Sequence, residues 1–225
     1  MKTFRHLPSR QFPELQVEET GHGRYYTAPT GEKLPSMTTV LGHFDHGWLE
    51  EWQARVGVEE ANRQSAYARN RGSKLHDLVE RYVRNEDIDV RKLMPHLQQS
   101  FRDILPAFDG VDNVQYQETQ LWSTELGVAG RCDLIADYYG IPAVIDTKTS
   151  ARPKTEDQIQ SYFEQTTGYA LMYEERTGVP LDTIVIIMVN DEDSKPQAFV
   201  KYKYPFISNL MEKIKTYKKE NQYVS

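Results

Sequence analysis

The spacing of apolar residues changes from a helical to a strand-like period about halfway along the chain. In the first half, apolar positions recur every three to four residues, which is typical of amphipathic helices. The clearest such set is Leu75, Leu78, Val79, Tyr82 and Val83. This period predicts helices over residues 49–65, 66–84 and 89–105, with Pro106 ending the third.

The second half is predicted to consist mainly of strands. β-rich composition predicts three strands in succession, over residues 113–122, 127–139 and 142–149. After them we expect a helix over residues 156–177, strands over 183–189 and 197–203, and a basic helix over 207–221. The run 183–189 is entirely apolar, as in a strand covered on both faces. This order predicts an α/β fold, with a mixed central β-sheet flanked by helices and a helical N-terminal half.

The N-terminal residues are predicted to form an extension and a small hairpin. Residues 1–22 are polar and indicate loose order, whereas residues 24–34 resemble two short strands around a turn. Ser36 or Thr38 is expected to cap the first helix. We expect one domain over residues 1–225. Its parts are an N-terminal extension and hairpin over 1–33, a helical part over 34–110, the sheet with the long helix over 111–205, and a C-terminal helix over 206–225.

The composition limits the kinds of site that the chain can build. Its net charge is −6 and its one cysteine is Cys132, which excludes an intrachain disulfide, a cysteine-ligated zinc site and a four-cysteine iron–sulfur cluster. A metal must therefore bind through carboxylates, histidine and backbone oxygens, which suit Mg²⁺ or Mn²⁺. The acidic balance weighs against nucleic-acid binding, although it does not describe local patches.

The chain also lacks the features of a membrane protein or a secreted protein. No stretch approaches the roughly 20 apolar residues that span a bilayer. Residues 1–6 contain no apolar signal-peptide core. We therefore expect no membrane partner and a cytoplasmic location.

Two neighbouring strands carry the residues with the clearest chemistry. Asp133 lies in the first, and Asp146 and Lys148 lie two residues apart in the second. Residues i and i+2 of a strand point to the same face, so Asp146 and Lys148 are expected to project together. Two carboxylates and an ammonium in a small space indicate a divalent cation and an activated water, which is the equipment for cutting a phosphodiester bond.

Taken alone, the D-x-K triple at Asp146–Lys148 has a simpler interpretation. Such a triple arises by chance, and an ion pair at a strand edge would explain it. Its context favours chemistry, because Asp146 follows an apolar run and Asp133 lies inside another. Carboxylates at such positions are costly unless they are paired or bound to a metal.

Five further residues could belong to the same site. His76 and Glu80 are four residues apart on a predicted helix and share a face. A lone helical histidine most often has a structural role, but an imidazole can also ligate Mn²⁺. Gln165 and Tyr169 form a similar pair, in which Tyr169 also fits the core and Gln165 could donate hydrogen bonds. Glu118 is either a further carboxylate near a metal or an exposed strand residue.

Basic residues cluster in sequence around these elements. The candidate phosphate contacts are Arg69, Arg71, Lys74, Arg131, Arg152 and Lys154. For any one of them, an ordinary surface charge is the better interpretation. The chain has no G-x-S-x-G elbow, no Walker A loop and no G-x-G-x-x-G fingerprint, so the classes that these motifs mark are not indicated.

The ordered combination of motifs resembles the RecB-like branch of the PD-(D/E)xK nucleases. The matching stretches are G-x-x-G-R-x-D-L-I at 127–135, V-I-D-T-K-T-S at 144–150 and Q-x-x-x-Y at 165–169. Residues 34–41 and 71–76, with Glu80, resemble the N-terminal motifs of small phage exonucleases, and mitochondrial genome maintenance exonucleases share this plan. The resemblance covers about residues 34–190 and implies a restriction-endonuclease-like core.

The resemblance implies a role for each matching residue. Asp133 and Asp146 would ligate one or two Mg²⁺ or Mn²⁺ ions, together with the Thr147 carbonyl and His76. Lys148 would orient or activate the attacking water. Gln165 and Tyr169 match the Q-x-x-x-Y helix, which supports the site or the substrate. Glu118, as a tentative metal ligand, and Glu80 are looser matches. Arg131, Arg71 and Lys74 are further candidates to support the site or bind substrate.

These residues together predict a metal-dependent DNA exonuclease that acts on single-stranded or frayed ends. If the N-terminal helices form an arch over the site, the substrate must thread a free end. The alternatives are a structure-specific endonuclease on the same fold and an inactive nucleic-acid-binding accessory protein of recombination. A phage origin, which would fit the resemblance, implies location in the host cytoplasm.

Overall fold

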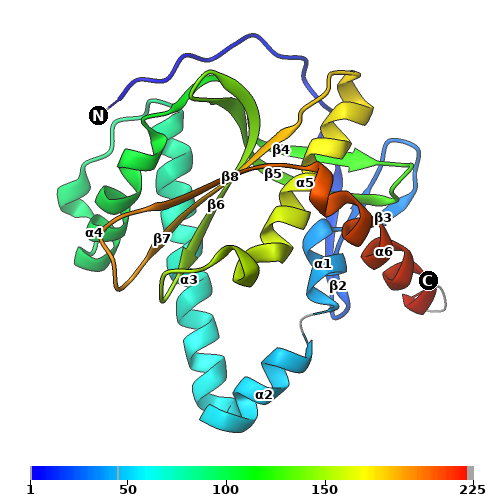
Figure 1. The fold of residues 1–225 in the computed structure, drawn as a ribbon, viewed down its shortest axis with the longest axis horizontal. Coiled ribbons are helices and arrows are strands. Elements are labelled where there is room, and N and C mark those ends of the chain that lie inside the picture. Colours follow the sequence, from blue (N-terminus) through cyan, green and yellow to red (C-terminus); the bar gives the residue numbers. More distant parts are fainter. Residues whose placement is uncertain (1, 45, 222–225) are drawn as a thin grey trace.

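The computed structural model of the chain describes residues 2–44 and 46–221, without the side chains of residues 46–50. Its centre is a mixed sheet in the order β4-β5-β6-β7-β8 (Figure 1). The strands are β4 (Val111–Ser123), β5 (Val128–Tyr138), β6 (Ile141–Ser150), β7 (Thr183–Asn190) and β8 (Gln197–Tyr202). β6 and β7 run parallel, and the other neighbours are antiparallel. The predicted α/β class with a mixed central sheet is therefore confirmed.

Helices cover both faces of this sheet (Figure 1). One face packs against α3 (Val58–Val83) and α4 (Pro95–Ile104), and the other against α1 (Met37–Gly42), α5 (Gln160–Thr177) and α6 (Tyr204–Asn221). Every residue of β7 is buried, and its side chains alternate between the two cores. The prediction of a strand covered on both faces is confirmed. The short 3-10 helix η3 (Glu156–Ile159) leads into α5, so the predicted long helix is also present.

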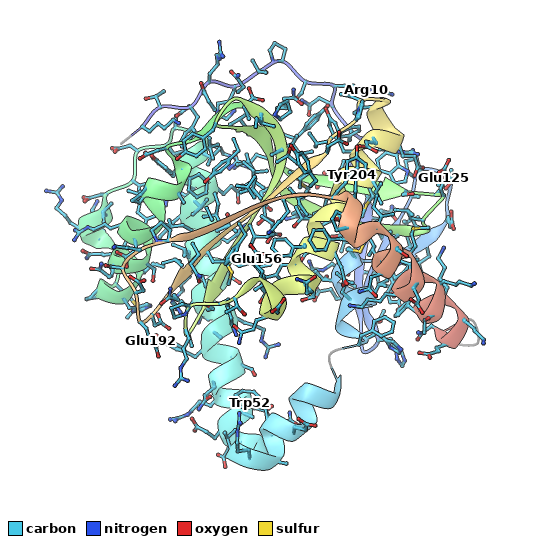
Figure 2. The ribbon with its side chains drawn as sticks, viewed as in Figure 1. Arg10, Trp52, Glu125, Glu156, Glu192 and Tyr204 are labelled. Atoms are coloured by element: carbon cyan, nitrogen blue, oxygen red, sulfur yellow. The ribbon has the colours of Figure 1, made fainter. Side chains whose placement is uncertain are left out.

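The first helices depart from their predicted boundaries. Gly57, with a φ of +87°, separates α2 (His46–Val56) from α3, so the break falls there and not after residue 65. Glycine adopts this left-handed conformation at little cost. Residues 46–67, called the helical bow below, project from the body between α1 and the rest of α3 (Figure 1). Figure 2 shows Trp52 on this bow, away from the sheet.

Two other helices begin at unexpected positions. The region 89–105 contains the 3-10 helix η1 (Val90–Lys92) and then α4, which starts at Pro95 because proline suits the first turn of a helix. A second 3-10 helix, η2 (Leu105–Phe108), follows it. At the other end of the chain, α6 begins at Tyr204, three residues before the prediction. Within the described residues, no helix has the length and the apolar run that a membrane crossing requires.

The N-terminal segment is more ordered than its polar composition indicated. β1 (Gln16–Thr20), β2 (Gly23–Thr27) and β3 (Lys33–Pro35) form a second, antiparallel sheet, which confirms the hairpin and adds a strand to it. The prediction of loose order over residues 1–22 is wrong for the described part of this segment. Phe4 and Leu15 are only 3% and 5% exposed and anchor it in the core.

Two glycines in the predicted motifs allow helices to approach the sheet closely. A Cβ on Gly130 of β5 would lie 2.7 Å from Cε1 of Tyr169, so the missing side chain makes room for that ring. A Cβ on Gly72 of α3 would lie 3.3 Å from Oγ1 of Thr149 in β6. α5 and α3 therefore meet the sheet next to the strands that carry the predicted carboxylates.

Gly130→Ala is expected to destabilise the protein by about 1–3 kcal/mol, because the new methyl group would overlap the buried ring of Tyr169. The free energy of unfolding, measured by urea titration with circular dichroism, checks this. Gly42→Ala is the matched control, since a Cβ there meets nothing within 4 Å, and it should change that free energy by less than about 0.5 kcal/mol. Equal destabilisation by both substitutions would contradict the packing argument.

Candidate active site

Three different elements of the described chain contribute to one cluster of metal-ligating side chains. His76 on α3, Glu118 on β4 and Asp133 on β5 present ligand atoms that all lie within 4.8 Å of one another. Nε2 of His76 lies 2.7 Å from Oδ2 of Asp133, and its Nδ1 lies 3.4 Å from Oε1 of Glu118. The sequence left structural roles open for His76 and Glu118, and the structure brings both of them to Asp133.

A local departure from regular strand geometry directs Glu118 and Asp133 toward His76. The pairing of Gln117 with Leu134 makes Glu118 and Asp133 neighbours across β4 and β5. Glu118 has a φ of +51°, a left-handed conformation that a residue with a side chain rarely adopts. Gln117 and Glu118 both face α3, and so do Asp133 and Leu134, so the alternation of faces fails on both strands. Both carboxylates thereby reach the same side of the sheet.

Asp146 and Lys148 project together from β6, as the strand period predicts. Nζ of Lys148 lies 2.5 Å from Oδ2 of Asp146, whose side chain is 1% exposed. Nε2 of Gln165 on α5 donates to Oδ1 of Asp146 at 3.3 Å and to the Tyr169 hydroxyl at 3.2 Å. Tyr162 was not among the predicted site residues, yet its ring centroid lies 5.3 Å from the Lys148 ammonium. Its spacing, three residues before Gln165, places it on the same side of the helix.

The backbone of Thr147 joins the two groups of side chains. Its N–H donates to Oδ2 of Asp133 at 2.9 Å, the same oxygen that meets His76. Because Thr147 lies between Asp146 and Lys148 in β6, this bond holds the β5 carboxylate next to the β6 ion pair. The resemblance implied a role for the Thr147 carbonyl, whereas the contact in the structure uses its N–H.

Burial and charge pairing set the protonation of these residues. Burial opposes the charge on His76, but Asp133 and Glu118 outweigh it and raise the pKa of the imidazole to about 9. Burial raises the pKa of Glu118 to about 7, and that of Asp146 to about 6 despite the nearby Lys148 ammonium. Burial also acts on Asp133, yet the His76 hydrogen bond keeps the pKa of that carboxyl below its usual value. These carboxylates therefore lie in surroundings that favour additional positive charge.

A cavity of about 310 Å³ lies beside this group, between α3 and β6. Lys148 and Thr147 line it from the sheet, and His76, Gly72 and Arg69 line it from α3. Two cationic side chains therefore face the same space. A ligand in this cavity would reach the ion pair of β6 and the imidazole of α3 together.

Arg71 is buried and makes structural contacts, so it is not an ordinary surface charge. Its side chain is 5% exposed, and its guanidinium forms an ion pair with Asp191 at 2.7 Å. It also lies 3.4 Å from the hydroxyl of Ser100 on α4. Arg71 therefore anchors the middle of α3 to α4 and to the segment after β7, and it does not line the cavity.

The remaining candidates lie around the site. Lys74 is exposed on α3, and Arg131 is exposed on β5, two residues before Asp133. Glu80 lies one turn beyond His76 and pairs with Arg84 at 2.5 Å. Lys74 and Arg131 thus remain available to a bound polyanion, whereas Glu80 is already paired.

The residues of the cluster fit a hard divalent cation. The donors are an imidazole and carboxylates without a thiolate, which suit Mg²⁺ and Mn²⁺. Oδ2 of Asp146 is buried and lies 2.5 Å from the Lys148 ammonium, so this carboxylate already has a cationic partner at a depth where an unpaired charge is costly. His76, Glu118 and Asp133 would hold the ion, and Asp146 lies outside that cluster.

Comparison with known proteins connects this chain to one family. The family model described as the PD-(D/E)XK nuclease superfamily matches residues 22–221. Among solved structures, the chain is similar to SSO0001, with 13% identity, 75% of this chain and 69% of that chain covered, and a TM-score of 0.41. It is also similar to a "Putative exonuclease" from Eubacterium rectale, with 11% identity, coverages of 82% and 68%, and a TM-score of 0.38. None of the curated proteins matches the chain.

The affinity for Mn²⁺ is expected to rise between pH 6 and pH 9. His76 has a pKa of about 9 and Glu118 one of about 7, so both carry protons at low pH that they must lose before they bind a cation. Each released proton contributes up to about tenfold in affinity per pH unit. Isothermal titration calorimetry of the DNA-free protein at three pH values measures this slope.

His76→Ala is the matched variant for this titration. It removes the group that titrates near pH 9, so its affinity should rise less steeply with pH than that of the unsubstituted protein. A Mn²⁺ affinity that is independent of pH in the unsubstituted protein would contradict the assignment of these ligands.

Proposed function

Because the chain belongs to the PD-(D/E)XK nuclease superfamily, we propose that it is a divalent-metal-dependent DNA exonuclease that hydrolyses phosphodiester bonds from single-stranded or frayed ends. The nuclease class follows from the family, and the proposal adds the metal, the DNA substrate and the need for an end. It treats residues 1–225 as one nuclease domain, in which the helical part over 34–110 precedes the catalytic sheet over 111–205.

The observation that carries this proposal is the pair of the buried Asp146 and the half-buried Lys148 beside the His76, Glu118 and Asp133 cluster. Lys148 lines the cavity, so its ammonium can orient an attacking water and stabilise negative charge on the phosphate. Asp146 holds that ammonium in place at 2.5 Å. Asp133 is oriented by the Thr147 N–H and by His76.

The cation of this proposal is Mg²⁺ or Mn²⁺, as one or two ions. When bound, it polarises the phosphate and lowers the pKa of a water ligand. His76, Glu118 and Asp133 would hold it, and Asp146 would face it from β6. Neutral imidazole and ionised carboxylates are the ligating forms, so the residues that bind it must first release their protons.

Other residues support this machinery. Gln165 and Tyr169 form a hydrogen-bonded pair that fixes Asp146 from the α5 side. Arg69 lines the cavity and Lys74 is exposed close by on α3, which suits them to contact phosphates of the substrate. Arg71 serves the site indirectly, since its ion pair with Asp191 positions α3.

The helical bow favours an exonuclease over an endonuclease. The chain leaves the body after α1 and returns along α3 (Figure 1). The part of α3 that follows the bow lines the cavity through Ala68, Arg69, Gly72, Ser73, Leu75 and His76. A strand that enters beneath such a projection does so most readily from a free end. The structure-specific endonuclease remains the main rival, and an inactive accessory protein is the rival from another class. The two experiments below separate all three.

Asp146→Ala is expected to lower metal-dependent cleavage of linear single-stranded DNA by about 10³-fold or more, because it removes the partner of Lys148 and a carboxylate of the site. Release of label from an end-labelled oligonucleotide with Mg²⁺ or Mn²⁺ measures this. Asp87→Ala is the control. It changes an exposed aspartate in the loop between α3 and η1, and this variant should cleave the DNA at the normal rate. Absence of metal-dependent cleavage by the unsubstituted protein would support the inactive accessory protein.

A closed single-stranded circle is expected to resist cleavage under conditions that degrade the linear form of the same sequence. The circle offers the same bonds but no end to thread past the helical bow. Gel electrophoresis of both substrates over one time course makes the comparison. Cleavage of circle and line at similar rates would overturn the exonuclease proposal in favour of the endonuclease.

A further inference from the structure

The N-terminal residues 4–15, called the N-terminal strap below, run along β4, the edge strand of the central sheet (Figure 1). Near the start of the strap, Leu7 N–H donates to the Val114 carbonyl at 2.8 Å. At its end, Leu15 N–H donates to Oε1 of Gln120 at 2.5 Å. Figure 2 labels Arg10 between these two attachments. The strap lies outside residues 22–221, which the family model matches.

The strap, β4 and Arg131 of β5 line an open cavity of about 250 Å³. Its walls combine an aromatic pair with amides, two carboxylates and one exposed cation, from the side chains of Gln11, Phe12, Glu14, Tyr116, Gln117, Glu118, Gln120 and Arg131. The rings of Phe12 and Tyr116 stack with centroids 5.0 Å apart. None of the motifs in the sequence includes Gln11 or Phe12.

This cavity adjoins the metal cluster directly. Glu118 and Gln117 line it, and the same two residues line the small space around His76 and Asp133. Arg131 lies two residues before Asp133 in β5, so a phosphate next to the metal cluster lies close to its guanidinium. The cavity between α3 and β6, with Arg69 and Lys148, lies on the other side of the cluster. A strand crossing the cluster therefore meets a cavity on each side.

The amides of this cavity offer both kinds of hydrogen-bonding group. Gln117 donates through Nε2 to the Glu80 carbonyl at 2.7 Å, so its amide oxygen remains as an acceptor. Gln120 accepts from Leu15 through Oε1, so its NH₂ group remains as a donor. A nucleobase edge presents donors and acceptors of the same kind.

We propose that this cavity binds one unpaired nucleotide of the substrate strand, next to the phosphate that is cleaved. Arg131 contacts the flanking phosphate, and the amides and the aromatic pair receive the base. A base held between the strap and β4 has left its complementary strand, so a duplex end must fray before its terminal bond is cut. This inference rests on the proposed nuclease function and names the substrate feature that its site reads.

The test uses linear oligonucleotides that each carry one abasic residue, at successive positions from the labelled end. In the unsubstituted protein, one position should lower kcat/KM about tenfold, since base stacking and base contacts are lost there. Two variants probe the cavity, namely Thr119→Trp, which fills it, and Gln11→Ala with Phe12→Leu, which alters the strap wall. Both should reduce the abasic penalty to less than about twofold, because the pocket that reads the base is gone.

Gln99→Ala, an exposed glutamine on α4, is the matched control and should keep the full penalty. Thermal melting identifies variants that fail to fold. If Thr119→Trp fails to fold, the double variant Gln11→Ala with Phe12→Leu still tests the cavity. An abasic penalty that is equal in all variants, or absent at every position, would overturn the proposed nucleotide cavity while leaving the nuclease function intact. Failure of the unsubstituted protein to cleave any oligonucleotide would instead overturn the proposed function itself.

Discussion

The rest of the site depends on the balance of charges inside the sheet. Asp146 is paired with Lys148 where water scarcely reaches the carboxylate, and an unpaired charge at that depth would be strongly destabilising. In this pair one positive charge balances one negative charge. The negative charges of Asp133 and Glu118 must therefore be balanced by another group. His76 supplies that charge in the arrangement described here, with its pKa raised to about 9. The positive charge of the imidazolium thus compensates the two carboxylates that the Asp146–Lys148 pair leaves over.

The predictable part of the site is the part that lies within one strand or one helix. Asp146 and Lys148 were placed correctly because a period of two fixes which side chains share a face. Gln165 and Tyr169 followed in the same way from a helical period. The approach of His76 to Asp133 was not predictable from spacing, since it depends on how α3 lies against the sheet. Gly72 and the Arg71–Asp191 pair set that position through contacts distant in sequence.

The errors in the fold have equally local causes. A helical period passes through Gly57 without interruption, and nothing in the pattern states that its φ is positive. The polar strap was expected to be loose because two buried residues, Phe4 and Leu15, are too few to form a period.

Arg71 was a candidate phosphate contact because the same guanidinium suits a surface phosphate and a buried carboxylate. Its ion pair holds the middle of a helix about 39 Å long, between the exposed bow and the part that carries His76.

The backbone of Glu118 shows what this arrangement demands of the fold. A left-handed conformation at a residue with a side chain is strained by about 1–2 kcal/mol. Glycine would remove that strain, but it would also remove the carboxylate that faces His76. Selection for stability alone would therefore favour losing the acidic group. Glu118 therefore combines a strained backbone with a carboxylate at the candidate site, and a substitution that relaxed the strand would dismantle the cluster.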